Sequence, residues 1–428
     1  MPRFLLINFL LLPISAIAAL DFSRDVLPII SDNCFKCHGP DANARKAKLR
    51  LDREEFALRK KAVLIVPGRS EESELIARIF SSDLDEQMPP PDSKLKLTAS
   101  QKATIKAWVD SGAKWGKHWA YEPPRRPALP IVKNAKWPRN EIDRFILARL
   151  EREGLKPSPE ADKITWLRRV SLALNGLPPT PKEVDAFLKS SNENPKSSFE
   201  KIVDRLLASP RYGERMAWDW LEAARYADSN GYQGDNDRTM CPWRYWVVRA
   251  LNANVPYDKF TIEQLAGDLL PKATDEQRLA TAFNRNHMIN GEGGRIAEEN
   301  RVEYIFDQME TMATLWLGTT MTCSRCHDHK FDPITQRDYY SLFAFFNNTP
   351  VNGGGGSGQT APVLAVGSPT QQKEILELEE KIKSLKEKPQ IDAAKKQLAA
   401  LRKKFPKVMV MRDEKPRQTK VLVRGEYN

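Results

Sequence analysis

The sequence is poor in cysteine and histidine, and it lacks a long apolar run beyond its first residues. Of 428 residues, five are Cys and five are His. After residue 19 no segment is apolar enough to cross a bilayer, which argues against a polytopic membrane protein. Four of the cysteines form two C-x-x-C pairs, Cys34/Cys37 and Cys323/Cys326. A bridge within such a pair closes too small a loop to stabilise a large domain, and five is an odd number, so a disulfide framework is disfavoured.

The overall composition is that of a globular protein. Hydrophobic residues make up 41% of the chain and charged residues 29%, which argues against wholesale disorder. At 428 residues the chain is too long for one ordinary core, so two or three domains are expected. Apolar residues recur mostly at helical spacing, which predicts a mainly α fold.

The first residues have the features of an export signal. Arg3 precedes an apolar run from Phe4 to Pro13, and Ala16-Ile17-Ala18 fits the small-residue pattern of a cleavage site. We therefore predict a signal peptide over residues 1–19 and a periplasmic or otherwise exported protein with no transmembrane segment after signal removal. The alternative is an uncleaved N-terminal anchor, which would export the rest of the chain equally.

Each cysteine pair is followed directly by a histidine. The two motifs are Cys34-Phe35-Lys36-Cys37-His38 and Cys323-Ser324-Arg325-Cys326-His327. C-x-x-C-H is the attachment signature of c-type haem. Two thiols three positions apart lie on one side of a helical turn and can bond both vinyl groups of one haem, and the adjacent histidine reaches the iron as proximal ligand. The sequence therefore predicts two molecules of haem c.

Other functions of these cysteines stay open. Zinc is also bound by C-x-x-C pairs, but a zinc site needs further ligands nearby, and none lies beside Cys34. A thioredoxin-like redox pair is expected within a βαβ unit, and neither motif has that context.

Residues after the first motif offer a second ligand for its iron. Met88 precedes three prolines, which restrict the loop that presents a soft thioether. The alternative is that Met88 packs in the core. A helix is expected from Thr98 to Ser111, because Thr98 and Gln101 form a capping box and Gly112 follows. The buried face of this helix should carry Ile105, Trp108 and Val109.

Two stretches of the chain resemble known families. The N-terminal part resembles the planctomycete cytochrome c domain, through Val26–Ile30, the Cys34–Gly39 motif, Pro67–Ser70 and Met88-Pro89-Pro90. The following part resembles the domain of unknown function that commonly follows this cytochrome domain in large exported proteins. The matching stretches there are Ser209–Arg215, Ala224–Asp228, Tyr257–Thr261, Gln264–Pro271 and Cys323–Pro333. The resemblance implies a redox function but no particular reaction.

The distal ligand of the second haem is harder to predict. Candidates are His287, Met288 and His329. His329 is too close to His327 for both to bracket one iron, so we expect it to form hydrogen bonds instead, for example with Asp332. We predict His287 as the ligand, with an open or methionine-ligated iron as the alternatives.

A polar cluster follows this histidine, and its role is open. It could line a catalytic pocket, or it could be a charged helix start with i,i+3 pairs. Its members are Glu292, Arg295, Glu298, Glu299 and Arg301.

The predicted organisation has seven segments. In the helical domain, Asn140 should cap a helix that turns Ile142, Phe145, Ile146 and Leu150 inward. The segments are a signal peptide (1–19), a cytochrome c-like domain (20–116), a Pro-rich linker (117–138), a helical domain with the second motif (139–350), a Gly-rich loop (351–370), a coiled-coil hairpin (371–406) and the strand-like start of a further segment (407–428).

Positive charge is spread along the chain. Lys and Arg number 67 against 56 Asp and Glu, a net charge of +11 without a basic block. We expect a redox partner protein, with an anionic polysaccharide as a further candidate partner and no nucleic acid. We predict an exported c-type cytochrome that transfers electrons through two haems. The alternatives are a haem-dependent oxidoreductase (peroxidase-like or acting on carbohydrate-derived substrates) with a catalytic second haem, and a zinc-binding or scaffold protein without haem.

Overall fold

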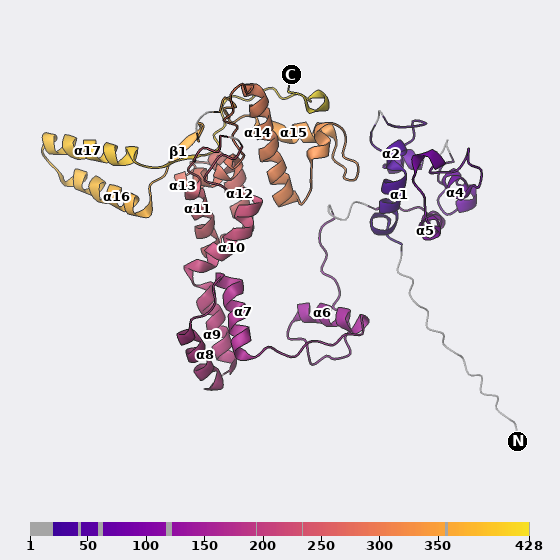
Figure 1. The fold of residues 1–428 in the computed structure, drawn as a ribbon, viewed down its shortest axis with the longest axis horizontal. Helices are drawn as coiled ribbons and strands as arrows, with labels where there is room; N and C mark the ends of the chain where they lie inside the picture. Colours follow the sequence, from indigo (N-terminus) through magenta and orange to yellow (C-terminus); the bar gives the residue numbers. More distant parts are fainter. Residues whose placement is uncertain are drawn as a thin grey trace. The chain divides into compact units, whose positions relative to one another are not determined.

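The computed structural model describes residues 20–41, 44–58, 63–116, 122–193, 195–232, 234–355 and 358–427. The predicted signal peptide lies outside these ranges. The described chain is mainly helical, as predicted, and its only strands there are β1 (Val363–Ala365) and β2 (Lys407–Met409) (Figure 1). The chain divides into two compact units. We call residues 1–128 with 327–334 the N-terminal unit, and residues 129–326 with 335–428 the helical unit.

The N-terminal unit is built from short helices around one apolar core. Thr98 and Gln101 form the predicted capping box, and Ile105, Trp108 and Val109 are buried as expected. Phe22 contacts Trp108 with ring centroids 5.3 Å apart, so the first helical segment packs on the last one. The helices are η1 (Phe22–Val26), α1 (Leu27–Asn33), α2 (Phe35–His38), α3 (Glu54–Ala57), η2 (Ser70–Glu72), α4 (Glu74–Phe80), η3 (Pro91–Ser93) and α5 (Ala99–Asp110).

The core of the helical unit forms where α10 and α11 lie side by side (Figure 1). Trp243 and Trp246 of α11 are buried there, and Trp220 of α10 packs against Phe260 and Phe283. The helices of this core are α10 (Pro210–Ala223), α11 (Cys241–Asn252), α12 (Tyr257–Ala266), η5 (Gly267–Leu269), α13 (Asp275–Ala280), η6 (Thr281–Arg285), α14 (Ala297–Met312), η7 (Ala313–Leu317), η8 (Thr322–Arg325) and α15 (Gln336–Phe346).

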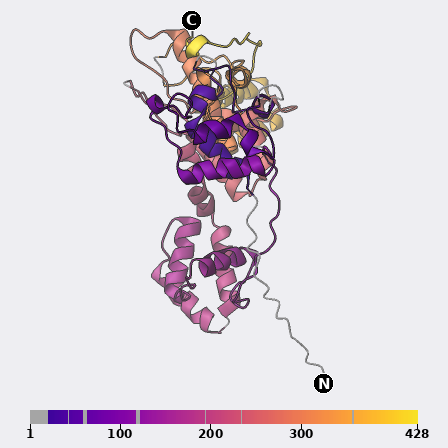
Figure 2. The same ribbon diagram turned by 90° about the vertical axis from the view of Figure 1, so that its right-hand side faces the viewer.

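Three further helices pack together and contact the core through α10 (Figure 2). They are α7 (Lys163–Asn175), α8 (Pro181–Glu193) and α9 (Pro195–Leu207). Trp166, Phe187 and Phe199 supply one aromatic ring from each helix, and the Trp166 and Phe199 centroids are 4.3 Å apart. Edge-to-face contacts of this kind add to the burial of apolar area.

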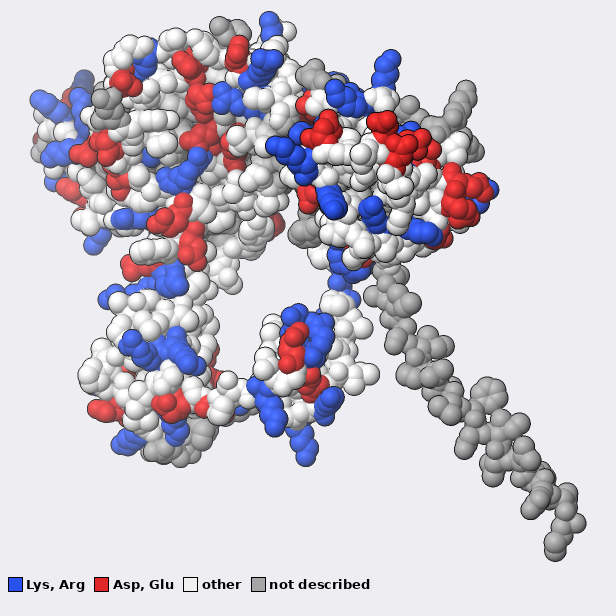
Figure 3. Space-filling view, turned by 45° about the vertical axis from the view of Figure 1, so that its right-hand side comes forward, with Lys and Arg blue, Asp and Glu red and all other residues white. Residues whose placement is uncertain are grey.

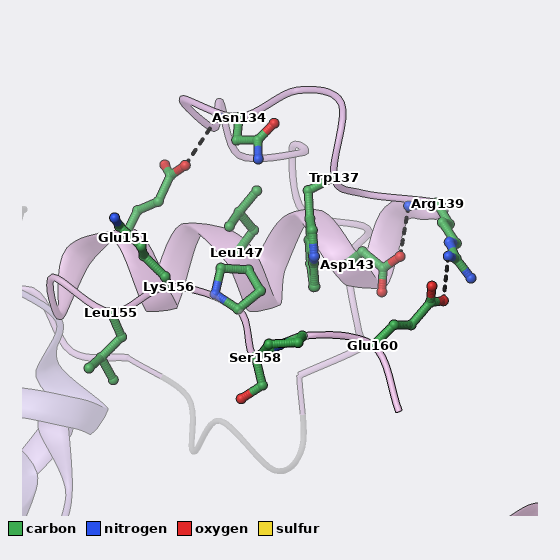
Figure 4. Close-up of a pocket in the computed structure, with 12 residues that line it drawn as sticks. Asn134, Trp137, Arg139, Asp143, Leu147, Glu151, Leu155, Lys156, Ser158 and Glu160 are labelled. Atoms are coloured by element: carbon green, nitrogen blue, oxygen red, sulfur yellow. Dashed lines mark hydrogen bonds and ion pairs between the residues drawn. The ribbon is translucent and has the colours of Figure 1, made fainter. Parts of the chain in front are cut away.

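The helix α6 (Glu141–Arg152) corrects one prediction. Asn140 caps it as expected, but Ile142, Phe145 and Ile146 are exposed, and Leu147 is the residue of this helix that is buried. Extended segments on both sides of α6 fold back along it, and together they line a cavity of about 810 Å³ (Figure 4). Glu151 accepts hydrogen bonds from the backbone of Lys133 and Asn134, which holds one segment on the helix.

The two strands pair antiparallel, with Val363 opposite Met409. The strand at Lys407 was expected, whereas Val421–Val423 does not form one and leads into a short helix, η9 (Val423–Gly425). Between the strands, α16 (Pro369–Ser384) and α17 (Lys388–Lys403) form the expected helical hairpin, and Arg402 pairs with Glu379 across it (Figure 1).

None of the helices in the described part of the chain is long and apolar enough to cross a membrane.

Close packing of α10 on α11 depends on Gly213. A Cβ atom there would lie 2.4 Å from the Val248 carbonyl oxygen and 2.6 Å from the Asn252 side chain. We expect Gly213→Ala to lower the free energy of unfolding of the helical unit by about 1–3 kcal/mol, because the two helices must separate. Thermal unfolding followed by far-UV circular dichroism measures this. Glu214→Ala, at an exposed position of the same helix, is the control, and equal stability of the two variants would contradict the prediction.

Candidate functional site

The first C-x-x-C-H motif lies on a single turn of backbone. Cys34 follows α1, and α2 carries Cys37 and His38. The Cys34 carbonyl accepts hydrogen bonds from the N–H groups of Cys37 (3.1 Å) and His38 (2.8 Å). Both thiols are free, as the prediction requires. One turn therefore fixes two sulfur atoms and one imidazole relative to each other.

The turn is anchored by the loop that follows. Lys46 N–H donates to the Cys37 carbonyl and Leu51 N–H to the His38 carbonyl, both at 2.8 Å. Gly39 lets the chain leave α2 at close range, because a Cβ atom there would lie 2.3 Å from the Phe35 carbonyl oxygen. The glycine after the motif therefore has a steric role.

The motif opens on a cavity of about 590 Å³. Cys34, Cys37, His38 and Met88 all line it, although Met88 is 50 positions beyond His38 in the sequence. The Arg78 carbonyl accepts a 3.0 Å hydrogen bond from Met88 N–H, so α4 holds the loop that presents the thioether. The apolar part of the lining is Leu49, Leu51, Leu64, Leu75, Ile79 and Leu95. The volume lies within the roughly 300–1,000 Å³ of ligand pockets.

Burial favours the uncharged form of the one histidine that lines the cavity. It lowers the pKa of the His38 imidazole, and the backbone of Lys46 opposes part of this shift. His38 Nδ1 is buried and makes no hydrogen bond of good geometry within the described residues. A buried polar atom of this kind is costly unless a bound group satisfies it, and neutral imidazole is the form that ligates iron. The residues of the first motif therefore fit haem.

The thiols do not resemble a thioredoxin-like pair. Burial, with a smaller contribution from Cys37, raises the pKa of the Cys34 thiol to about 12. Redox-active C-x-x-C pairs have the opposite shift, because they depend on a stabilised thiolate. Within the described residues, no group of three or more His, Cys, Asp or Glu side chains could hold a metal ion, which leaves the zinc alternative without a donor set there.

The second motif has different surroundings. Cys323, Cys326 and His327 are exposed, whereas Ser324 between them is fully buried. His327 Nδ1 lies 2.8 Å from the Asp328 carbonyl, which makes this nitrogen the donor. The middle of the motif is thus packed into the protein, while its two cysteine side chains and its histidine side chain are exposed.

His287 lies in the core of the helical unit and stays a predicted ligand. Its ring stacks on Tyr304 with centroids 4.6 Å apart, and Nδ1 donates to the Met288 carbonyl at 3.1 Å. Nε2 is therefore the nitrogen with the free electron pair, and it is buried without a partner within the described residues. Burial lowers the pKa of His287 well below its usual value, and Arg285 adds to the shift. Among the described residues, His287 contacts Tyr304, Arg238 and Met288, which belong to the helical unit outside the second motif.

Two further polar features have structural roles. His329 is buried, and its Nδ1 accepts the Asp332 N–H at 2.9 Å, which confirms the hydrogen-bond role. Arg301 forms two hydrogen bonds to Glu298, so this part of the polar cluster is the i,i+3 pair of a helix start. Arg301 also donates to Asn347 at 2.6 Å, which ties α14 to the end of α15.

Sequence reasoning missed the residues that fix the two motifs and the core through contacts with distant parts of the sequence. The Arg78 carbonyl positions Met88, and Arg325 anchors the second motif through Glu303 of α14. Arg285 is fully buried and donates to the Val410 carbonyl, 125 positions further along the chain. A weak signal existed only for Arg325, which lies inside the motif itself.

The raised pKa of Cys34 predicts that its thiol reacts slowly with alkylating reagents in the haem-free chain. At pH 8 a thiol with a pKa of about 12 is thiolate in about one molecule in ten thousand, against about one in ten for a cysteine with an ordinary pKa of about 9.0. We expect the rate of Cys34 alkylation by iodoacetamide, measured by peptide mass spectrometry, to keep rising above pH 9. A plateau near pH 9 would contradict the assigned burial, and Cys323, which is exposed, is the internal control.

Comparison with known families agrees with this geometry. The family model described as planctomycete cytochrome C matches residues 34–92, which hold the first motif and Met88. The model described as a protein of unknown function (DUF1549) matches residues 141–351, which hold the second motif. No curated protein and no solved structure matches the chain significantly. The two family matches and the cavity at the first motif identify the chain as a planctomycete-type cytochrome c protein, in which a c-type haem domain is followed by the DUF1549 domain.

Proposed function

We propose that this protein transfers electrons through two covalently bound haems, one at each C-x-x-C-H motif. The observation that carries the proposal is the cavity of about 590 Å³ lined by Cys34, Cys37, His38 and Met88. It brings two attachment thiols and two different axial ligand types to one apolar space. A haem bound there supplies a one-electron couple.

The residues of the first site have separate roles. Cys34 and Cys37 hold the cofactor covalently, so it is not lost in an open compartment. His38 and Met88 would hold the iron, and the soft thioether of Met88 would raise its reduction potential. The leucine and isoleucine lining excludes water, which limits the charge rearrangement on electron transfer.

At the second site, Cys323 and Cys326 attach the haem and His327 is its proximal ligand. His287 is the distal ligand in the electron-transfer proposal. Its neutral ring with an unprotonated Nε2 supports this role, although bonding would require a change in its present packing. Bis-histidine ligation favours electron transfer at low potential.

The exposure of the second motif supports an alternative function. Cys323, Cys326 and His327 all face outward, so an iron bound there would be reachable by small molecules. An open coordination position would make the second haem catalytic, in a peroxidase-like or carbohydrate-linked oxidoreductase.

Export and partners belong to the same proposal. We infer from residues 1–19 that the protein works in the periplasm or another exported location. Lys and Arg side chains are interspersed with Asp and Glu on the face in Figure 3, without a large patch of one sign. This pattern supports salt-dependent encounters with a redox partner protein, and a weaker, less specific attraction to anionic polysaccharide.

Haem stoichiometry tests the proposal directly. The pyridine haemochrome spectrum and intact mass of the protein, produced with haem-attachment machinery, should show two haems per chain. Replacing Cys323 and Cys326 by Ala should leave one, and so should replacing Cys34 and Cys37. Cys241→Ala is the control, because Cys241 belongs to neither motif. A protein without covalent haem would exclude the proposal.

The ligand set of the first haem is tested at Met88. We expect Met88→Ala to convert this haem from low spin to high spin and to let it bind carbon monoxide, because the distal position opens. Absorption spectra with and without carbon monoxide measure both effects, with Met216→Ala of α10 as control. Carbon monoxide binding by the wild-type protein would instead indicate an open second iron and favour the catalytic alternative. If the spectra of Met88→Ala, with and without carbon monoxide, are the same as those of the wild type, Met88 is not a ligand.

A further inference from the structure

The short turn at Leu422–Glu426 lies against the second motif. Three of its carbonyl groups accept hydrogen bonds from the motif and from the helix after it. Arg424 O accepts from Cys326 Sγ at 3.1 Å, Gly425 O from Arg325 Nη2 at 3.1 Å, and Leu422 O from Gln336 Nε2 at 3.4 Å. The turn is 98 positions away from Cys326 along the chain, so no local sequence pattern connects the two.

The backbone of this turn is specialised for close approach. Arg424 and Gly425 both have left-handed conformations, with φ of 53° and 76°. This conformation is costly for an arginine and free of strain for a glycine. A Cβ atom at Gly425 would lie 2.5 Å from Nε and 2.7 Å from Cγ of Arg325. A side chain at residue 425 would therefore displace Arg325 from its present position, whereas glycine leaves room for it.

Arg325 transmits this contact to the motif. Its Nη1 pairs with Glu303 at 3.0 Å, and its guanidinium lies 4.2 Å from the centre of the Phe306 ring, so α14 holds it from the other side. Its own carbonyl accepts from Tyr340 at 3.0 Å and from Gln336 at 3.0 Å. The side chain and the backbone of Arg325 are both fixed, whereas Cys323, Cys326 and His327 of the motif are exposed.

We propose that the turn Leu422–Glu426 is a positioning element of the second haem-attachment site. It clamps Arg325 and orients the Cys326 thiol, so that Cys323 and Cys326 are presented together on the surface. Attachment adds each Sγ–H across a vinyl double bond: sulfur bonds one vinyl carbon and the thiol proton goes to the other, with no oxidant or reductant. Both thiols must be held at positions that match the two vinyl groups, and an exposed 3₁₀ turn alone does not fix them there. This inference rests on the proposed second haem.

The test compares two glycine substitutions with the same backbone cost. Gly425→Ala introduces a methyl group against Arg325, whereas Gly294→Ala has a similar φ of 79° and nothing within 4 Å. We expect Gly425→Ala to lower the haem content from two per chain toward one, with the haem at Cys34 and Cys37 retained. Gly294→Ala should keep two. Two haems in Gly425→Ala would overturn the proposal.

A second measurement separates this inference from the two-haem proposal. In haem-free protein, iodoacetamide should modify Cys326 several-fold faster in Gly425→Ala than in wild type, because Arg424 no longer accepts its hydrogen bond. The rate at Cys37, which lies in the N-terminal unit, is the internal reference, and far-UV circular dichroism verifies folding. Equal Cys326 rates in the two proteins would overturn the clamp even if one haem were lost. If wild type carries one haem but the rates differ, the clamp stands and the two-haem function fails.

Discussion

The first site depends on one hydrogen-bonded turn, in which the Cys34 carbonyl accepts two N–H groups. This turn gives two thiols and an imidazole fixed positions, and the rest of the N-terminal unit completes a cavity around them. Helix α5, with Ile105 and Trp108 buried, packs on both η1 and α4. Since α4 supplies the Arg78 carbonyl that holds Met88, one capped helix stabilises both the segment that enters the motif and the loop that carries Met88, the proposed second ligand.

The two motifs share a sequence pattern but differ in what surrounds them. At the first, the attachment side chains line a cavity and the burial of Cys34 raises the pKa of its thiol. At the second, the intervening Ser324 is buried, Arg325 is clamped between α14 and the C-terminal turn, and the cysteines are exposed. The pattern therefore specifies which groups can bond to haem, while tertiary contacts decide how far solvent and other molecules reach the iron.

Local features were predictable and distant ones were not. The capping box at Thr98, the buried face of α5 and the hairpin of α16 and α17 all follow from spacing within a few turns of helix. The same reasoning failed for α6, where Ile142 and Ile146 are exposed because apolar periodicity predicts a face but not what covers it. Pairings such as Arg325 with Gly425 join residues 100 positions apart, and no local pattern encodes them.

The cysteines of the first motif are more buried than those of the second, which supports different roles for the two sites. Burial favours the neutral forms of His38 and Cys34 in the first cavity, whose lining is mainly apolar, with Lys36, Lys46, Arg78 and Asp92 as its charged residues. Such a site suits an iron that changes its charge by one electron and keeps its ligands. The thiols of the second motif are exposed, so its iron would be more sensitive to whatever binds beside it. The distal ligand decides whether an iron at the second motif exchanges electrons with a partner protein or reacts with a substrate. To become that ligand, His287 would have to give up its stacking on Tyr304 and its hydrogen bond to the Met288 carbonyl.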